Sequence, residues 1–440
     1  MKLVRTVKQE RPNPKAIQSD RGRKVVTPFL SKLGPGLITG ASDDDPSGIA
    51  TYSQVGAQFG YGLLWTMLLS YPLMAAIQEI CGRIGRVTGC GLAANLRKNY
   101  PKPLLFFVLL LMSIANVFNL GADIGAMGSS AALLVPGGPT LFTIVFGVVS
   151  LLTIFFIPYT TYAKYLKWLT LSLFAYFGVA FFVRIPWLEV AKATVIPHMF
   201  FSRESFVALI AVLGTTISPY LFFWQASQEA EEVKNNRGEK ALKRAPAQAP
   251  EQLKRIHADT LVGMAFSNLV AFSIILTAAA TLHAHGITNV STCAQAASAL
   301  EPIAGRFARL LFVCGIVGTG LLAVPVLAAS AAYGIGEGCS WKTGLEIKPM
   351  RAWRFYGVIG AAIAIGLLMS FFHVDPLKAL VWAAALNGLV AAPLMVVIML
   401  MASNSKVMGK FKLPRYLLWT GWLATATMTC VCVGLFLTWK

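Results

Sequence analysis

Charged residues are scarce in this chain. Asp, Glu, Lys and Arg make up 13% of its 440 residues, whereas soluble globular domains carry about 25%. Hydrophobic residues reach 56%, more than one water-facing fold can bury. This composition excludes an ordinary soluble domain, a disordered chain and a nucleic-acid-binding module. It predicts a protein that crosses a membrane several times.

Paired cysteines and catalytic motifs are also lacking. The seven cysteines are scattered and form no C-x-x-C pair, which excludes a disulfide framework and a zinc site. No hydrolase, zinc-protease, phosphate-loop or dinucleotide motif occurs in a supporting context, so we do not expect an enzyme or a bound cofactor. Residues 1–32 are basic and polar without the apolar core of a signal peptide, and we interpret them as a flexible cytoplasmic tail.

Long apolar runs, by contrast, are abundant. A helix needs about 20 apolar residues to cross the hydrocarbon core. Windows of this kind, separated by charged residues, proline or glycine, predict eleven spans. The spans cover roughly residues 33–60, 61–81, 103–135, 139–157, 165–184, 205–228, 258–282, 304–335, 354–373, 376–402 and 415–438. The predicted fold is therefore an all-α polytopic membrane protein.

The net charge of +19 follows the predicted topology. Most of the 38 Lys and Arg residues fall in the tail and in alternate connections, which places these segments in the cytoplasm by the positive-inside rule. Eleven spans then put Lys440 outside. We expect an integral protein of a bacterial inner membrane, with the lipid bilayer as a partner, no nucleic acid and no obligatory protein partner. The charge marks one side of the membrane because no soluble basic face exists.

Two of the predicted spans carry a proline in mid-membrane beside small polar residues. The first contains Asp45 and Pro46, and the sixth contains Ser218 and Pro219. Proline interrupts a helix, while Asp and Ser are good N-caps for a new half-helix that starts with proline. Breaks at corresponding positions indicate a transporter with two inverted five-helix repeats. We expect repeat one over about residues 33–184, repeat two over about 205–402 and an extra helix over about 415–438 within one domain, residues 33–438. The alternative is two proline kinks without a ligand.

Three consecutive aspartates precede the proline of the first break. One aspartate at a helix centre costs about 2.5 to 3.5 kcal/mol, and three would repel one another unless protonated, wetted or neutralised by a cation. We expect Asp45 to bind a cation, with its N-cap role as the alternative. Asp43 and Asp44 are expected in an aqueous vestibule or in structural hydrogen bonds.

The stretch Gly34–Trp65, with Asp45-Pro46-Ser47-Gly48 at its centre, resembles the first helix of the Nramp (natural resistance-associated macrophage protein) metal transporters. Residues 77–101 resemble the segment that closes the family's second helix. The resemblance covers about residues 33–438. It implies a LeuT-like fold with eleven transmembrane helices and broken helices one and six. It also implies a divalent metal held between the two breaks, usually with proton co-transport.

This sequence departs from the family pattern at several positions. Asp45 matches the metal-binding aspartate, but Gly48 replaces the asparagine ligand, and Ser218-Pro219-Tyr220 replaces Met-Pro-His. Asp123 matches an acid of the proton route, whose glutamate partner is replaced by Ala126. The set expected at the ion, including a backbone oxygen of Thr215 and a cavity-lining Asn387, is Asp45, Gly48, Thr215, Ser218, Tyr220 and Asn387.

Loss of the thioether favours a hard ion with oxygen ligands, Mg²⁺ or Mn²⁺. In this the chain is similar to the Nramp-related magnesium transporter branch. Proton coupling is expected to be weak or absent, with Asp123, Asp44 and Asp43 on any proton route or vestibule. The same departures are compatible with a second hypothesis, a LeuT-like carrier of a small organic cation or an amino-acid-like solute.

Overall fold

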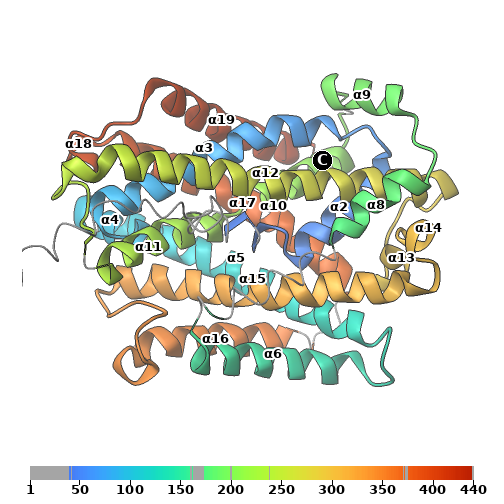
Figure 1. Ribbon diagram of the computed structural model, residues 1–440, viewed down its shortest axis with the longest axis horizontal. Helices are drawn as coiled ribbons and strands as arrows, with labels where there is room; N and C mark the ends of the chain where they lie inside the picture. Colours follow the sequence, from blue (N-terminus) through green and yellow to red (C-terminus); the bar gives the residue numbers. More distant parts are fainter. Residues whose placement is uncertain are drawn as a thin grey trace, which may run out of the picture. The chain divides into compact units, whose positions relative to one another are not determined.

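The computed structural model describes residues 39–40, 42–158, 161, 173–198, 201–236, 238–369, 371 and 375–438. These residues belong to one compact unit, residues 34–440. The predicted tail (residues 1–32), the start of the first predicted span and residues 165–172 of the fifth lie outside the described residues. The regular elements drawn in Figure 1 are all helices.

The structure has the following elements in chain order. The α-helices are α2 (Pro46–Phe59), α3 (Trp65–Thr88), α4 (Leu92–Asn99), α5 (Lys102–Ala131), α6 (Pro139–Phe156), α8 (Phe174–Phe182), α9 (Trp187–Val195), α10 (Arg203–Thr216), α11 (Pro219–Asn235), α12 (Ala249–Thr281), α13 (Cys293–Ser298), α14 (Glu301–Ala304), α15 (Ala308–Gly338), α16 (Trp353–Met369), α17 (Pro376–Ser403), α18 (Ser405–Met408) and α19 (Arg415–Leu437). The 3₁₀ turns are η4 (Pro246–Gln248), η5 (His283–His285), η6 (Gly305–Phe307) and η7 (Pro349–Arg351).

Each of the eleven predicted spans contains a helix, which confirms the all-α membrane fold. Among the described residues, seven helical stretches are long and apolar enough to cross a membrane. The boundaries differ from the prediction mainly at α3 and α12. Both helices continue beyond their apolar windows into a charged segment, because their last or first turns pack against α11 and the loop after it. We call this end of the bundle, where α3 and α11 end and α12 begins, the charged end.

The prolines of the described helices fall into two groups. Pro72, Pro325 and Pro393 lie inside the uninterrupted helices α3, α15 and α17. Pro46 and Pro219 instead occupy the first position of α2 and α11. A proline within a span therefore does not by itself end a helix in this protein. The two interrupted spans are the ones in which an N-cap residue precedes the proline.

Small residues let the half-helices pack closely against their neighbours. A β carbon added at Gly56 of α2 would lie 2.4 Å from the carbonyl oxygen of Ile275 in α12. One added at Gly214 of α10 would lie 2.0 Å from the carbonyl oxygen of Ala384 in α17. Such close backbone contacts are typical of helix packing in membranes, where glycine and alanine replace larger side chains. They fix α2 and α10 against the long helices that surround them.

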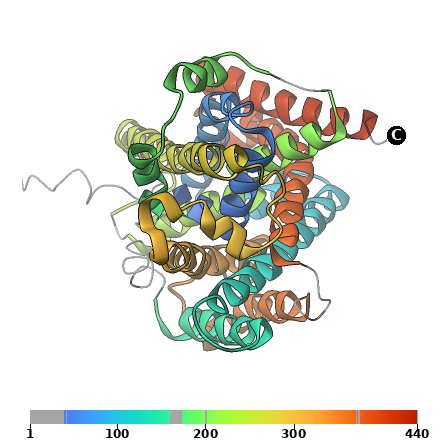
Figure 2. The ribbon, with the colours of Figure 1, turned by 90° about the vertical axis from the view of Figure 1, so that its right-hand side faces the viewer.

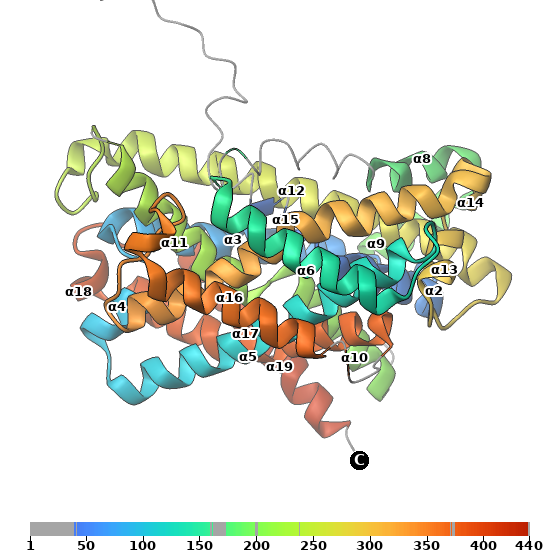
Figure 3. The same ribbon diagram turned by 90° about the horizontal axis from the view of Figure 1, so that it is seen from below.

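The outer surface of the bundle is apolar. Helices α6 and α16 lie side by side against α5 (Figures 1 and 3). Large exposed side chains on these and other outer helices include Phe106, Leu141, Val148 and Trp419. The end view in Figure 2 looks along α12, which runs lengthwise in Figure 1. A water-soluble surface would not carry so many exposed apolar residues, and we assign this surface to contact with lipid.

Candidate functional site

The structure confirms both predicted interruptions. Before α2, residues 39, 40, 42 and 43 are helical, Asp44 forms a bend and Asp45 is extended. In the sixth span α10 ends at Thr216, Ser218 is extended and α11 begins at Pro219. The carboxylate of Asp45 accepts a hydrogen bond from the amide of Gly48 at 2.9 Å, which is the predicted N-cap interaction.

Asp45 is the centre of a buried polar cluster. Its Oδ1 atom accepts hydrogen bonds from the hydroxyl of Ser47 (2.6 Å) and the amide of Gly48. Its Oδ2 atom accepts from Nδ2 of Asn119 (2.9 Å) and lies 3.4 Å from the hydroxyl of Tyr220. Only 2% of Asp45 is exposed. The donors on Ser47, Gly48 and Asn119 stabilise an ionised carboxylate, because each directs a partial positive charge at its oxygens.

Tyr220 connects the two interrupted spans. Its hydroxyl donates to the carbonyl oxygen of Ser42 at 3.0 Å, so the start of α11 is tied to the end of the first half-helix. Ser42 is one of the residues at which a helix end leaves carbonyls available. The phenol replaces the histidine of the family pattern with a group that donates a hydrogen bond here. It thus lies at the predicted site, beside Asp45.

Asn119 of α5 links Asp45 to two further polar side chains, one in α5 and one in α17. Its amide lies 3.5 Å from Oδ2 of Asp123, one turn later in α5, and its Oδ1 lies 3.5 Å from Nδ2 of Asn387 in α17. All three side chains are buried, and Oδ1 of Asp123 and of Asn387 have no hydrogen-bond partner among the described atoms. The structure therefore brings Asp123 and Asn387 to the same cluster as Asp45.

The second break uses its polar groups within α10. The hydroxyl of Ser218 donates to the carbonyl oxygens of Gly214 (3.2 Å) and Thr215 (2.6 Å), and it makes no cap bond to α11. Ser218 thus occupies the predicted N-cap position of α11, but its side-chain oxygen accepts no cap bond, and its hydroxyl points to the carbonyls left free at the end of α10. The hydroxyl of Thr215 donates to Tyr52 in α2 or to a carbonyl of its own helix.

Gly48 contributes backbone only. Its amide is used by the cap of Asp45, and a β carbon at this position would lie 3.3 Å from the ring of Tyr52. Tyr52 occupies the space that a longer side chain at position 48 would need. The side chains nearest to Asp45 are therefore those of Ser47, Asn119 and Tyr220.

Asp43 and Asp44 lie on another side of the break, against α12. Oγ of Ser267 lies 2.8 Å from Oδ2 of Asp43 and 3.1 Å from Oδ1 of Asp44. The exposed fractions of the two aspartates are 1% and 2%, so in this conformation neither faces an aqueous vestibule. Their other oxygens, Oδ1 of Asp43 and Oδ2 of Asp44, have no hydrogen-bond partner among the described atoms.

The central aspartates take no part in the ion pairs of the described residues. None of the ion pairs between described residues includes Asp43, Asp44, Asp45 or Asp123. Within the described part of the chain, no three His, Cys, Asp or Glu side chains form a cluster that could hold a metal. A cation at Asp45 would therefore take one carboxylate, with hydroxyl, amide and carbonyl oxygens as its other ligands.

Sequence reasoning missed two residues of these clusters, Asn119 and Ser267. A signal for Asn119 existed, since Asn116, Asn119 and Asp123 recur every three or four residues in an otherwise apolar stretch and so share one face of α5. Ser267 had no comparable signal. Its role depends on how α12 is rotated against the first half-helix, which is a tertiary property.

A vestibule opens at the end of the bundle opposite to the charged end. It has a volume of about 260 Å³ and lies between α2, α10 and α17. Thr51, Gln54 and Gln58 of α2 line one side of it, and Arg203 and Glu204 of α10 line another. Gln54 also accepts a hydrogen bond, at 2.8 Å, from the amide of Val290 in the loop after η5.

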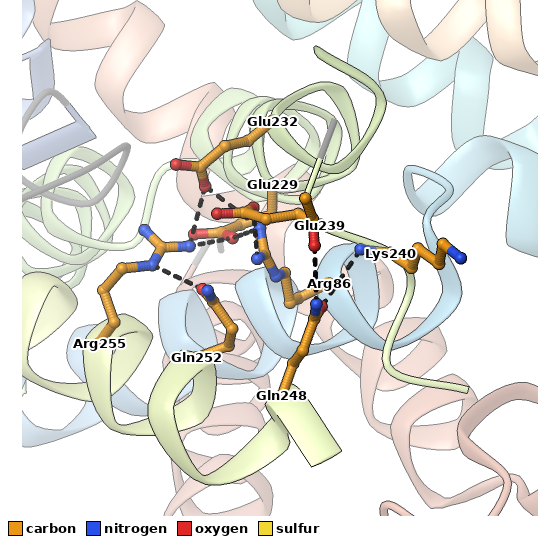
Figure 4. Close-up of polar contacts among 9 residues, drawn as sticks. Arg86, Glu229, Glu232, Glu239, Lys240, Gln248, Gln252 and Arg255 are labelled. Carbon is orange, nitrogen blue, oxygen red and sulfur yellow. Dashed lines mark hydrogen bonds and ion pairs between the residues drawn. The ribbon is translucent and has the colours of Figure 1, made fainter. Parts of the chain in front are cut away.

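The charged end carries a network of buried ion pairs (Figure 4). Arg86 of α3 contacts Glu232 (3.4 Å) and Glu239 (2.5 Å), while Arg255 of α12 contacts Glu229 (2.6 Å) and Glu232 (2.9 Å). The side chains of Arg86 and Glu229 are fully buried. This network joins α3, α11 and α12 at this end of the bundle.

Comparisons with known proteins agree with this architecture. The family described as natural resistance-associated macrophage protein-like (Nramp) matches residues 36–438. The divalent metal cation transporter MntH of Klebsiella pneumoniae (strain 342) is 26% identical over 428 residues, covering 93% of this chain and 94% of that protein.

Two solved structures show the same fold. The Eremococcus coleocola manganese transporter superimposes with a TM-score of 0.70 at 18% identity, over 92% of this chain and 85% of that one. Mhp1, a nucleobase-cation-symport-1 family transporter in a closed conformation, gives 0.55 at 14% identity, over 92% of both chains. With a family match over nearly its whole length and the helical breaks of a LeuT-fold transporter, this chain belongs to the Nramp family of transporters.

Proposed function

We propose that this protein carries divalent metal ions across a membrane, with Mg²⁺ and Mn²⁺ as its preferred cargo. The observation that carries the proposal is the buried carboxylate of Asp45, which lies between two interrupted spans and has no cationic partner in the part of the chain that the structure describes. Burying an ionised carboxylate costs free energy unless a cation binds to it. The relatives named above as divalent metal and manganese transporters support the same class of cargo.

The choice of ion rests on the ligand chemistry around Asp45. Its neighbours supply hydroxyl, amide and carbonyl groups from Ser47, Asn119, Tyr220 and Ser42. None of these carries a thioether or an imidazole, the groups that favour softer transition metals. Oxygen ligands suit Mg²⁺ and Mn²⁺, and Mg²⁺ keeps several of its waters. This proposal places the chain with the magnesium-transporting Nramp relatives.

Transport would proceed by alternating access of two inverted repeats. The ion enters through the vestibule beside Gln54 and Gln58 and reaches Asp45 near Thr51, while the network at the charged end keeps the other side closed. With the charged end in the cytoplasm, as the distribution of Lys and Arg indicates, an inside-negative potential drives entry. It contributes about 2.3 kcal/mol per charge for each 100 mV.

Proton coupling is weak or absent in this proposal. Tyr220 stands where the family pattern has a histidine, and Ala126 stands where it has the glutamate partner of Asp123. Asp123 is retained and lies next to Asn119, but it has no titratable partner of the usual kind. A metal flux driven by the membrane potential needs no proton.

The test is a flux assay on protein in liposomes with a potassium-diffusion potential. We expect uptake of Mg²⁺ and Mn²⁺ without acidification of the lumen, and its loss in Asp45→Asn. Asp375→Asn is the matched control, because Asp375 also caps a helix, by accepting from the amide of Leu377 at 3.1 Å, and lies away from the breaks.

Two results would contradict the proposal. A stoichiometric proton influx with the metal would show that Tyr220 and Ala126 do not abolish coupling. Absence of metal flux, with uptake of an amine or amino acid that depends on Asp45, would establish the competing function of an organic-solute carrier. Side-by-side screening of Mg²⁺, Mn²⁺, Ca²⁺ and small amines distinguishes these outcomes in one preparation.

A further inference from the structure

We propose that Asp43, Asp44 and Ser267 form a second station for a divalent cation, separate from the one at Asp45. The inference rests on the proposed function, because it assumes that the cargo is a divalent metal. It goes beyond that function in assigning direct ion binding to a pair of acids that the family motif does not use. The station lies between the end of the first half-helix and α12.

The pair is positioned by a close helix contact. A β carbon added at Gly40 would lie 2.2 Å from the carbonyl oxygen of Gly263 in α12, so the two backbones touch at this point. One helical turn later on each side lie Asp43 and Asp44 on the half-helix and Ser267 on α12. The spacing of one turn brings these three side chains together. The contact therefore presents two carboxylates and one hydroxyl to the same space.

This site has fewer hydrogen-bond donors than its two carboxylates can accept from. The hydroxyl of Ser267 has one proton, so it can donate to Asp43 or to Asp44 but not to both. Among the described atoms, Oδ1 of Asp43 and Oδ2 of Asp44 form no hydrogen bond, although only 1% and 2% of these residues is exposed. Buried polar atoms are nearly always paired in native proteins, and a bound ion is one explanation of the exceptions. A cation between the carboxylates supplies the missing partner.

Several buried acids pair with basic side chains of the described residues. Glu229 contacts Arg255, and Glu79 contacts Arg83 and His257. Glu231 and Glu337 form no ion pair there but accept hydrogen bonds from Tyr333 and Ser227. Asp43 and Asp44 differ from both groups, because no described Lys or Arg pairs with them and one hydroxyl serves the two carboxylates.

Charge and position indicate which cation fits. Two carboxylates carry a charge of −2, which one divalent ion neutralises, whereas a monovalent ion would leave a buried net charge. The hydrogen-bond partners of Asp45 are Ser47, Gly48, Asn119 and Tyr220, and Ser267 is not among them. The two stations therefore use different ligands. An ion released by Asp45 would find the next carboxylates at the end of the first half-helix, beside Ser267 of α12.

The test counts bound Mn²⁺ on the purified full-length protein in detergent by electron paramagnetic resonance. We expect two Mn²⁺ per chain in the wild type, one in Asp45→Asn and one in the double variant Asp43→Asn, Asp44→Asn. Because Asn mimics a protonated Asp, the double variant keeps a neutral form of the pair. The two wild-type ions should also broaden each other's spectra, which either variant abolishes.

Several outcomes would contradict the proposal of a second ion site. One Mn²⁺ in the wild type, unchanged by the double variant and lost in Asp45→Asn, would show that Asp43 and Asp44 merely share a proton. Loss of both ions in Asp45→Asn would show that the pair is not an independent site. No bound Mn²⁺ at all would refute the proposed function as well, so the two failures are distinguishable.

A second variant covers the case in which the double variant does not fold. Ser267→Ala leaves both carboxylates in place and removes only the hydroxyl. We expect roughly ten- to hundredfold weaker binding of one Mn²⁺ and unchanged binding of the other, as for the loss of a supporting group at a metal site. Equal affinity of both ions in Ser267→Ala and in the wild type would contradict the proposal.

Discussion

The two buried acidic clusters of this protein differ in how their charge is balanced. At the charged end, Glu229 and Glu232 contact Arg86 and Arg255. At the helix breaks, none of the ion pairs between described residues includes an aspartate. Both clusters lie on the interrupted spans, so burial alone does not explain the difference. The paired glutamates join neighbouring helices. The aspartates, which form no such pair among the described residues, are available to bind a transported cation.

The comparison also separates stability from function. Removing one member of a buried ion pair leaves the other charge unpaired, which costs several kcal/mol. Removing an acid that has no protein partner relieves repulsion and desolvation instead. The same kind of substitution is therefore expected to have opposite effects at the two places. Functional sites commonly carry such a cost in stability.

The largest expected effect is that of Arg86→Ala at the charged end. The substitution leaves Glu232 and Glu239 without this guanidinium, and we expect a loss of about 3 to 5 kcal/mol in stability. Thermal unfolding in detergent, followed by size-exclusion chromatography, measures it. Arg83→Ala is the control, because Arg83 pairs with Glu79 four residues earlier and is partly exposed. Equal losses in both variants would remove the distinction between the network that joins three helices and the single ion pair within α3.

The opposite sign is expected at the breaks. Asp43→Asn should stabilise the metal-free protein by about 1 to 2 kcal/mol, because it removes a buried charge next to Asp44 and keeps a group that can bond to Ser267. The melting temperature without divalent ions and with saturating Mn²⁺ checks this prediction. The gain should disappear when the metal is present. A destabilised metal-free variant would indicate that Asp43 has a structural role like that of Glu229.

A smaller change is expected in ion preference. Ser218→Met places a thioether at the second break, where the hydroxyl now donates to the carbonyls of Gly214 and Thr215. We expect a shift of roughly tenfold, about 1.4 kcal/mol, from Mg²⁺ toward softer ions such as Cd²⁺. Competition of each ion with Mn²⁺ uptake measures the ratio. An unchanged ratio would mean that position 218 does not contact the cargo.

The smallest effect is expected for Tyr220→Phe. Its hydroxyl donates to Ser42 and approaches Asp45, so its loss removes one neutral hydrogen bond worth about 1 kcal/mol. The concentration of Mg²⁺ for half-maximal uptake should rise several-fold, while the maximal rate stays within about twofold. Proton flux should remain absent. Appearance of proton flux in this variant would show that Tyr220 blocks a route that Asp123 still offers.

Local sequence rules predicted the spans, the two breaks and the cap at Asp45. These features depend on apolar runs and on an N-cap residue followed by proline, and both act over a few residues. The same rules placed Ser218 at the N-cap of α11 but did not predict its side-chain contacts, which are with the carbonyls of Gly214 and Thr215. These contacts depend on how α10 and α11 meet, which the sequence does not display.

Partners from distant helices were beyond these rules. Asn119 contacts Asp45 from 74 residues away, and Ser267 contacts Asp43 from 224 residues away. The polar stripe of α5 pointed to Asn119, whereas nothing around Ser267 distinguished it from other serines. Arg86 and Arg255 were likewise visible only as cytoplasmic charge. Their pairing with the glutamates of α11 depends on the rotation of three helices.

The measurement that tests the central claim most directly is an anomalous difference map from crystals soaked in Mn²⁺. The account predicts a peak at coordination distance, about 2 Å, from the carboxylate of Asp45, between the two interrupted spans. Crystals of Asp45→Asn should lose that peak. Saturating Mn²⁺ that gives no peak at the breaks, or a peak that persists without the carboxylate, would contradict the account.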